Sequence, residues 1–213
     1  DLYKSQIQPL MGRRAEALDD QTGAAGRQMA LAQYEKAADI DGGLPDAWRG
    51  QGRVLNLLAL ESNIKQAEEM LTRAIGCYET ARQERSWDAD FYLDFGSAVQ
   101  NLAKLHSDSK GLNYCHYAAR LFILAAEKDE SRFEPLFKAG QSLYQAGLIS
   151  DEPEEVFESA AAFLRQAAEL EPKDPWSRLL SARCLLELAR LENAAEPRQL
   201  LEQAAVWCAQ AAA

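Results

Sequence analysis

The chain has 213 residues, of which 47% are hydrophobic, as expected of a folded protein with a core of its own. Its 33 acidic and 23 basic residues give a formal net charge of −10. This balance argues against nucleic acid and against an anionic membrane surface as partners, because both are bound through basic side chains.

No apolar run approaches the roughly 18 residues of a membrane-spanning helix, and no segment has the features of a signal peptide. We therefore expect a cytoplasmic protein. The sequence begins at Asp1, so a leader or a preceding domain could have been removed. Cys77, Cys115, Cys184 and Cys208 are widely spaced, so buried reduced thiols are favoured over disulfides, although four cysteines leave a disulfide open.

Helical periodicity runs along the whole chain, and no stretch alternates as a half-buried strand does. The first two helices are expected at about 2–19 and 25–40, with a break at 19–26 and a turn at 42–45. The later helices are expected at about 46–61, 64–83, 88–106, 111–128, 132–146, 153–170, 175–191 and 197–212. The chain is therefore predicted to be all-α.

One pattern recurs along the chain: a small residue, a large apolar residue four positions later, and a small residue three positions beyond. The copies are Ala74/Tyr78/Ala81, Ala30/Tyr34/Ala37, Ala118/Phe122/Ala125, Ala160/Leu164/Ala167 and, more faintly, Ala204/Cys208/Ala211. They start 44, 44, 42 and 44 residues apart in chain order, and such a fixed period is typical of helical repeats. Each copy occupies one helix face, where the small residues let a neighbouring helix approach.

A second pattern, a bulky residue followed four positions later by Gly, runs in phase with the first. Its copies are Trp48/Gly52, Tyr92/Gly96, Leu136/Gly140 and a degenerate Arg178/Ala182. Each period therefore holds two helices, and we expect Tyr78 and Phe122 to be buried with the glycines at close helix contacts. The prediction is a single domain over residues 1–213, with units at about 1–42, 43–86, 87–130, 131–172 and 173–213.

These two patterns resemble the tetratricopeptide repeat (TPR) family over about residues 20–213. The family's helix pair carries a Trp, then Leu-Gly, then Ala, an aromatic residue, Ala and a closing Pro. Trp48/Gly52 with Ala74/Tyr78/Ala81 follows this pattern, and Pro172 stands where the closing proline belongs. The units exceed the family's usual length of about 34 residues by roughly ten, always between the Gly and the next Ala. The resemblance implies a right-handed α-solenoid of antiparallel helix pairs.

Residues that could carry catalysis are few. His106 and His116 fall on different predicted helices, and the one thiol–imidazole pair, Cys115-His116, consists of helix neighbours that point about 100° apart. No nucleotide-binding, metalloprotease or calcium-loop motif is present. The acidic run at residues 151–155 is interpreted as the charged start of a helix. We therefore expect no catalytic residue, no metal site and no cofactor. The aromatic residues Trp48, Tyr92, Trp176, Tyr34, Tyr78 and Phe122 are interpreted as core.

Function is expected on the face of each first helix that points away from its Trp/Gly contact, because first helices line the concave surface of such an array. Candidate residues there are Arg49, Arg53, Asn56, Asp94, Ser97, Asn101, Lys138, Gln141, Gln145 and Arg183. The resemblance implies a scaffold or adaptor that holds a peptide or helix of another protein in this groove. The alternative is a structural subunit that packs through its convex face and its ends.

The last predicted helix carries Leu200, Leu201, Val206 and Trp207 but little charge after Glu202. A terminal repeat normally needs a polar outer face, since nothing stacks beyond it. We therefore expect Trp207 to lack cover from its own chain. Either the sequence is part of a longer chain, or this end contacts a partner or a second copy.

Overall fold

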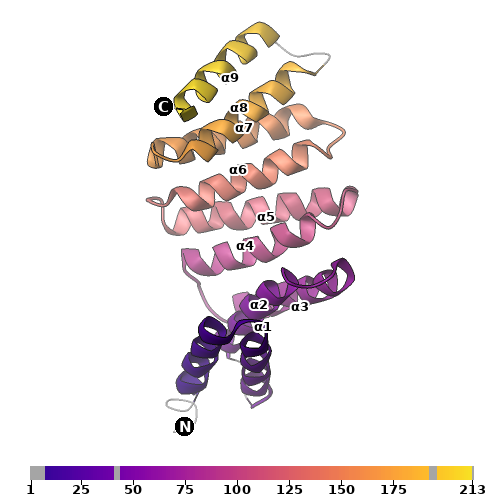
Figure 1. Ribbon diagram of the computed structural model, residues 1–213, viewed down its shortest axis with the longest axis vertical. Helices are drawn as coiled ribbons and strands as arrows, with labels where there is room; N and C mark the ends of the chain where they lie inside the picture. The colour runs from indigo at the N-terminus through magenta and orange to yellow at the C-terminus, as the bar shows by residue number, and fades with distance from the viewer. Residues whose placement is uncertain (1–7, 41–43, 192–195, 213) are drawn as a thin grey trace. The chain divides into compact units, whose positions relative to one another are not determined.

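The computed structural model describes residues 8–40, 44–191 and 196–212, and these residues form nine α-helices and no strand (Figure 1). The helices are α1 (Gln8–Ile40), α2 (Pro45–Ala59), α3 (Ile64–Glu84), α4 (Ala89–Ala103), α5 (Ser109–Lys128), α6 (Phe133–Gly147), α7 (Pro153–Leu170), α8 (Pro175–Ala189) and α9 (Pro197–Ala212). The predicted all-α class is confirmed. Among the described helices none combines the length and the apolar character needed to cross a membrane.

The helices pack into two compact units. Unit 1 consists of Asp1–Trp87 and Ser97–Leu105, and unit 2 of Asp88–Gly96 and His106–Ala213. In unit 1, α2 contacts both α1 and α3. In unit 2, each helix from α5 to α8 contacts the next one in the chain, as expected when every repeat packs on its sequence neighbours. The single domain with five repeat units stays a prediction.

Helix starts follow from local chemistry. Prolines occupy the first turn of α2, α7 and α8, where the missing N–H costs no hydrogen bond. The side chains of Asn63, Asp108 and Asp174 cap α3, α5 and α8 by accepting hydrogen bonds from backbone N–H groups. From α2 onward the predicted helices are confirmed, and the largest discrepancy is the end of α4, predicted at 106 and observed at Ala103.

The first two predicted helices form one nearly continuous helix, α1. The backbone is helical from Gln8 to Ile40 except at Gly23, where φ is 61° and ψ is −149°. This conformation is open almost only to glycine, so the predicted break within 19–26 is confirmed but narrows to one residue. The predicted helix start at residue 2 and residues 42–43 of the predicted turn lie outside the described residues.

Helix pairs are locked by the predicted contact between a glycine and a large side chain. A Cβ atom on Gly52 would lie 2.7 Å from the Tyr78 ring, and one on Gly96 would lie 2.7 Å from the Phe122 ring. At Gly140 the same atom would lie 2.5 Å from Leu164. Tyr78, Phe122 and Leu164 are fully buried. Both repeat patterns are therefore confirmed as the two sides of one contact.

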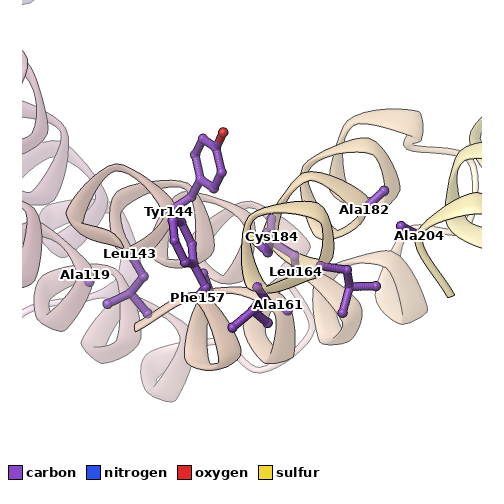
Figure 2. Packing of buried hydrophobic residues seen from close by; sticks show 12 residues of the cluster. Ala119, Leu143, Tyr144, Phe157, Ala161, Leu164, Ala182, Cys184 and Ala204 are labelled. Carbon is purple, nitrogen blue, oxygen red and sulfur yellow. The ribbon is translucent and has the colours of Figure 1, made fainter. Parts of the chain in front are cut away.

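The core of unit 2 extends from α5 to α9 (Figure 2). The degenerate fourth copy takes part, since Ala182 and Ala204 are both buried in this core. Leu200 and Trp207 are partly buried and pack against it. The expectation that Trp207 lacks cover from its own chain is therefore wrong, because α9 turns this side chain toward α8 and the core. The large apolar side chains exposed on α9 are Leu201 and Val206, at 50% and 54%.

The aromatic residues expected in the core are buried or partly buried, with one exception. Trp48 is partly buried and packs against Ala37, Ala38 and Ala47. Trp176 is 65% exposed in the first turn of α8, so its assignment to the core is wrong. The reason lies in helix phase. Ser177, not Trp176, points into the protein at this turn, and its hydroxyl donates to the capping carboxylate of Asp174.

Candidate functional site

The candidate residues all lie on the first helices α2, α4, α6 and α8. Each glycine or alanine of the second pattern turns one side of its first helix toward the second helix of the pair. Most candidates lie on other sides of their helix, at least 100° around it from this residue, as predicted. Arg49 and Asn56 differ, because spacings of three and four residues place them beside Gly52. Arg49, Arg53, Asn56, Asp94, Ser97, Asn101, Lys138 and Gln141 are partly buried, while Gln145 and Arg183 are exposed. We call these ten residues the first-helix face.

In unit 1 one arginine of α2, Arg49, lies close to a tryptophan that the sequence did not single out. Trp87 is buried, and its indole N–H donates to the carbonyl of Ala81 at 2.9 Å. The guanidinium carbon of Arg85 lies 3.9 Å from the centre of the Trp87 ring, and that of Arg49 lies 5.6 Å from it. Such cation–aromatic contacts restrain a long side chain, so Arg49 is held rather than freely solvated.

Two candidate amides of unit 1 meet directly. The Asn101 side-chain nitrogen donates to the Asn56 side-chain oxygen at 3.0 Å. Lys104 in turn donates to the Asn101 oxygen at 3.3 Å. Asn56 lies on α2 and Asn101 on α4, so this chain of polar contacts joins two first helices that are 45 residues apart in sequence. This hydrogen bond uses neither the amide nitrogen of Asn56 nor the second N–H of Asn101. Such amide groups can bind the backbone of a peptide.

In unit 2 the candidate cations lie over aromatic rings. The Lys138 ammonium lies 5.7 Å from the centre of the Phe122 ring, and the guanidinium carbon of Arg183 lies 5.7 Å from that of Tyr144. Burial raises the pKa of the Tyr144 hydroxyl, and the Arg183 charge partly opposes this effect. At neutral pH Tyr144 is therefore a neutral phenol beneath a cation. Asp94 on α4 and Gln141 on α6 are half-buried, and so is Ser97, which lies on the part of α4 that belongs to unit 1.

The chemistry around Cys115 does not suit a nucleophile. Its thiol is buried, and burial raises the pKa to about 11, so the reactive thiolate is rare at neutral pH. Burial raises the pKa of Cys77 to about 11 and that of Cys184 to about 12 in the same way. All four cysteines are free, and Cys208 is exposed, contrary to the expected burial. Within the described ranges no three His, Cys, Asp or Glu residues gather as a metal site would require.

The acidic run at residues 151–155 is placed as predicted, at a helix start. Glu154 and Glu155 occupy the first turn of α7, where carboxylates complement the helix dipole. Sequence reasoning missed the role of Trp87, which lies in the connection before α4. A tryptophan there has no counterpart one period later in the chain, so the repeat gave no signal for it.

No protein-family model matches the sequence, and no curated protein matches it either. Solved structures match its fold. YrrB, described as a TPR protein with an unusual peptide-binding site, is similar with a TM-score of 0.64 and 17% identity over 99% of this chain and 93% of YrrB. A crystal structure of MamA is similar with a TM-score of 0.60 and 13% identity over 92% of both chains. Another, MamA MSR-1 C2, gives 0.58 and 16% over 97% of both chains. The chain therefore has the fold of TPR solenoids.

Proposed function

We propose that this chain is a non-enzymatic interaction scaffold that binds a peptide or helix of a partner protein along its first-helix face. The observation that carries the proposal is the charge of that face. It holds four cations, Arg49, Arg53, Lys138 and Arg183, and one anion, Asp94, although acidic residues outnumber basic ones in the chain. A basic face that persists in an acidic protein is suited to an acidic partner.

The neighbouring groups support the same proposal. The Asn56–Asn101 pair offers amide groups that can pair with the main chain of an extended peptide. Arg49, Lys138 and Arg183 are steadied by aromatic rings, which reduces the side-chain entropy lost when a ligand binds. YrrB, one of the structures with this fold, is itself described as having a peptide-binding site.

The test is a selection of short random peptides displayed on phage against the whole chain. Enriched peptides are then measured against Arg53→Gln/Lys138→Gln and against a matched control, Lys65→Gln/Arg120→Gln, whose exposed side chains lie on the second helices α3 and α5. We expect affinity to fall about tenfold or more in the first variant and to stay unchanged in the control. The proposal is overturned if no peptide is enriched, or if both variants bind alike.

A second function, a structural subunit of a larger assembly, is favoured by α9. Leu201 and Val206 are about half exposed there and could pack against another protein. Its test is light scattering on the chain and on Leu201→Glu/Val206→Glu. Association of the parent that disappears in this variant supports the subunit, and a monomeric parent at every concentration argues against it.

A further inference from the structure

Among the first helices, α8 is distinguished by large exposed apolar side chains. Trp176 is 65% exposed and Leu179 is 36% exposed, and Arg183 follows as an exposed cation. Spacings of three and four residues place these three on one side of the helix. Ser177, Ser181, Leu185 and Leu188 are buried on the opposite side of α8. Ala182 and Cys184 border the exposed side and are buried in the core (Figure 2). We call Trp176, Leu179 and Arg183 the α8 face.

The α8 face corresponds in position to the basic part of α2. Leu179 and Arg183 stand three residues before and one residue after Ala182, and Arg49 and Arg53 stand in the same relation to Gly52. Leu179 and Arg183 of the α8 face therefore occupy the same repeat positions as the two arginines of α2. The α8 face differs in that an aliphatic residue replaces the first arginine and an exposed tryptophan precedes it.

Arg183 lacks a carboxylate partner on its own helix. The nearest one along α8, Glu187, pairs with Arg190 at 3.0 Å instead. Within the described part of the chain Arg183 makes no ion pair and is held only over the Tyr144 ring. Figure 2 shows the Tyr144 hydroxyl pointing away from the other labelled core side chains. Lys138, on the neighbouring helix α6, is also without an ion pair among the described residues.

We propose that the α8 face binds a segment of a partner protein that combines a large apolar side chain with a carboxylate. Trp176 and Leu179 supply apolar area, and Arg183 supplies a fork of N–H donors matched to a carboxylate. Tryptophan and arginine are the residues most enriched among those that dominate binding energy. Seven residues of helix span about 10 Å, so the two groups of the ligand lie about three residues apart in an extended segment.

The net charge of the chain decides between a partner protein and a second copy of this chain. Two copies each carry a formal charge of −10 and repel one another, whereas an exposed unpaired arginine in such a chain attracts an acidic segment of another protein. This assignment rests on the proposed function and adds the chemical class of the ligand and its anchor residues.

The experiment uses the same phage selection on the whole chain and reads two further quantities. The first is the composition of the enriched peptides, expected to join an acidic residue to an aromatic residue or leucine. The second is their affinity for Trp176→Ala and Arg183→Gln. Leu148→Ala and Arg120→Gln are the controls, because Leu148 is 52% exposed at the end of α6 and Arg120 is exposed on α5. All four side chains are exposed, so thermal unfolding should match the parent.

We expect affinity to fall about tenfold in each α8 variant and to stay unchanged in both controls. Enriched peptides that are basic, or that bind Trp176→Ala and Arg183→Gln as well as the parent, overturn this inference and leave the proposed function standing. Dimerisation of the parent that Trp176→Ala abolishes overturns it too, because a second copy then covers the face. A selection that enriches nothing overturns the proposed function and this inference together.

Discussion

Gly96 and Phe122 illustrate how single residues determine the geometry of a helix pair. The Phe122 ring occupies the space in which any side chain at position 96 would begin, and its side chain is fully buried. The same relation holds between Gly52 and Tyr78. A glycine in the middle of a helix normally costs about 0.5–1 kcal/mol, so these glycines are favoured by the close approach they permit.

We therefore predict that Gly96→Leu lowers the free energy of unfolding by about 1–3 kcal/mol or more, because the added side chain must displace a packed ring. The control is Gly76→Leu. Gly76 lies exposed within α3, and a Cβ atom there would meet nothing within 4 Å. That change should stabilise by about 0.5–1 kcal/mol through helix propensity alone. Urea unfolding measures both, and equal effects of the two substitutions would contradict the assigned contact.

At the same scale, burial governs the reactivity of the thiols. Cys77, Cys115 and Cys184 are buried with raised pKa values, and Cys208 is exposed on α9. We predict that iodoacetamide labels only Cys208 in the native chain at about pH 8 and labels all four cysteines after unfolding. Mass spectrometry of the labelled peptides checks this. Rapid native labelling of Cys115 would reopen a catalytic role for the Cys115-His116 pair.

At the scale of the element, helix starts depend on a few capping groups, and that of α5 should respond to pH. Asp108 accepts hydrogen bonds from the backbone N–H groups of Gly111 and Lys110, at 3.2 and 3.1 Å. The bond from Gly111 is the main reason that the pKa of this carboxyl lies below its ordinary 3.8. The carboxylate therefore stabilises the folded chain fully above about pH 3.8, and the effect is lost as pH falls through the lower folded pKa.

We predict that the melting temperature of the parent exceeds that of Asp108→Asn at neutral pH and that the difference shrinks as pH falls below about 3.8. Asparagine is a suitable control because it caps helices without titrating. Differential scanning calorimetry over this pH range measures the difference. A difference that is constant, or that grows in acid, would show that the Asp108 charge does not stabilise α5.

Helices and their pairing could be predicted from the sequence because a period of about 44 residues repeats the same small and large side chains five times. The break at Gly23 could be predicted only as a range of residues, because the polar, glycine-rich stretch at 19–26 does not indicate which residue leaves the helix. Trp176 was misplaced because large aromatic residues are usually buried. Trp176 is exposed because the helix that starts at the Asp174 cap turns Ser177 inward instead. The repeat pattern is degenerate at Arg178/Ala182, so it did not indicate this helix phase.

At the scale of the whole molecule, the two helices of each pair have different roles. Second helices supply the large residues that fill the core, as Tyr78, Phe122 and Leu164 do. First helices supply the glycines or alanines of these contacts, and they also carry the cations, the amides and the exposed Trp176. The repeat predicts the first role from the sequence alone. The second remains a proposal, since charge and exposure indicate a binding surface without naming its partner.

The most direct test of this division is amide chemical-shift mapping of the whole chain with a phage-selected peptide. We predict that the perturbed amides concentrate on the first helices α2, α4, α6 and α8, with those around Trp176, Leu179 and Arg183 among them. Perturbations confined to the second helices α3, α5, α7 and α9 would contradict the account.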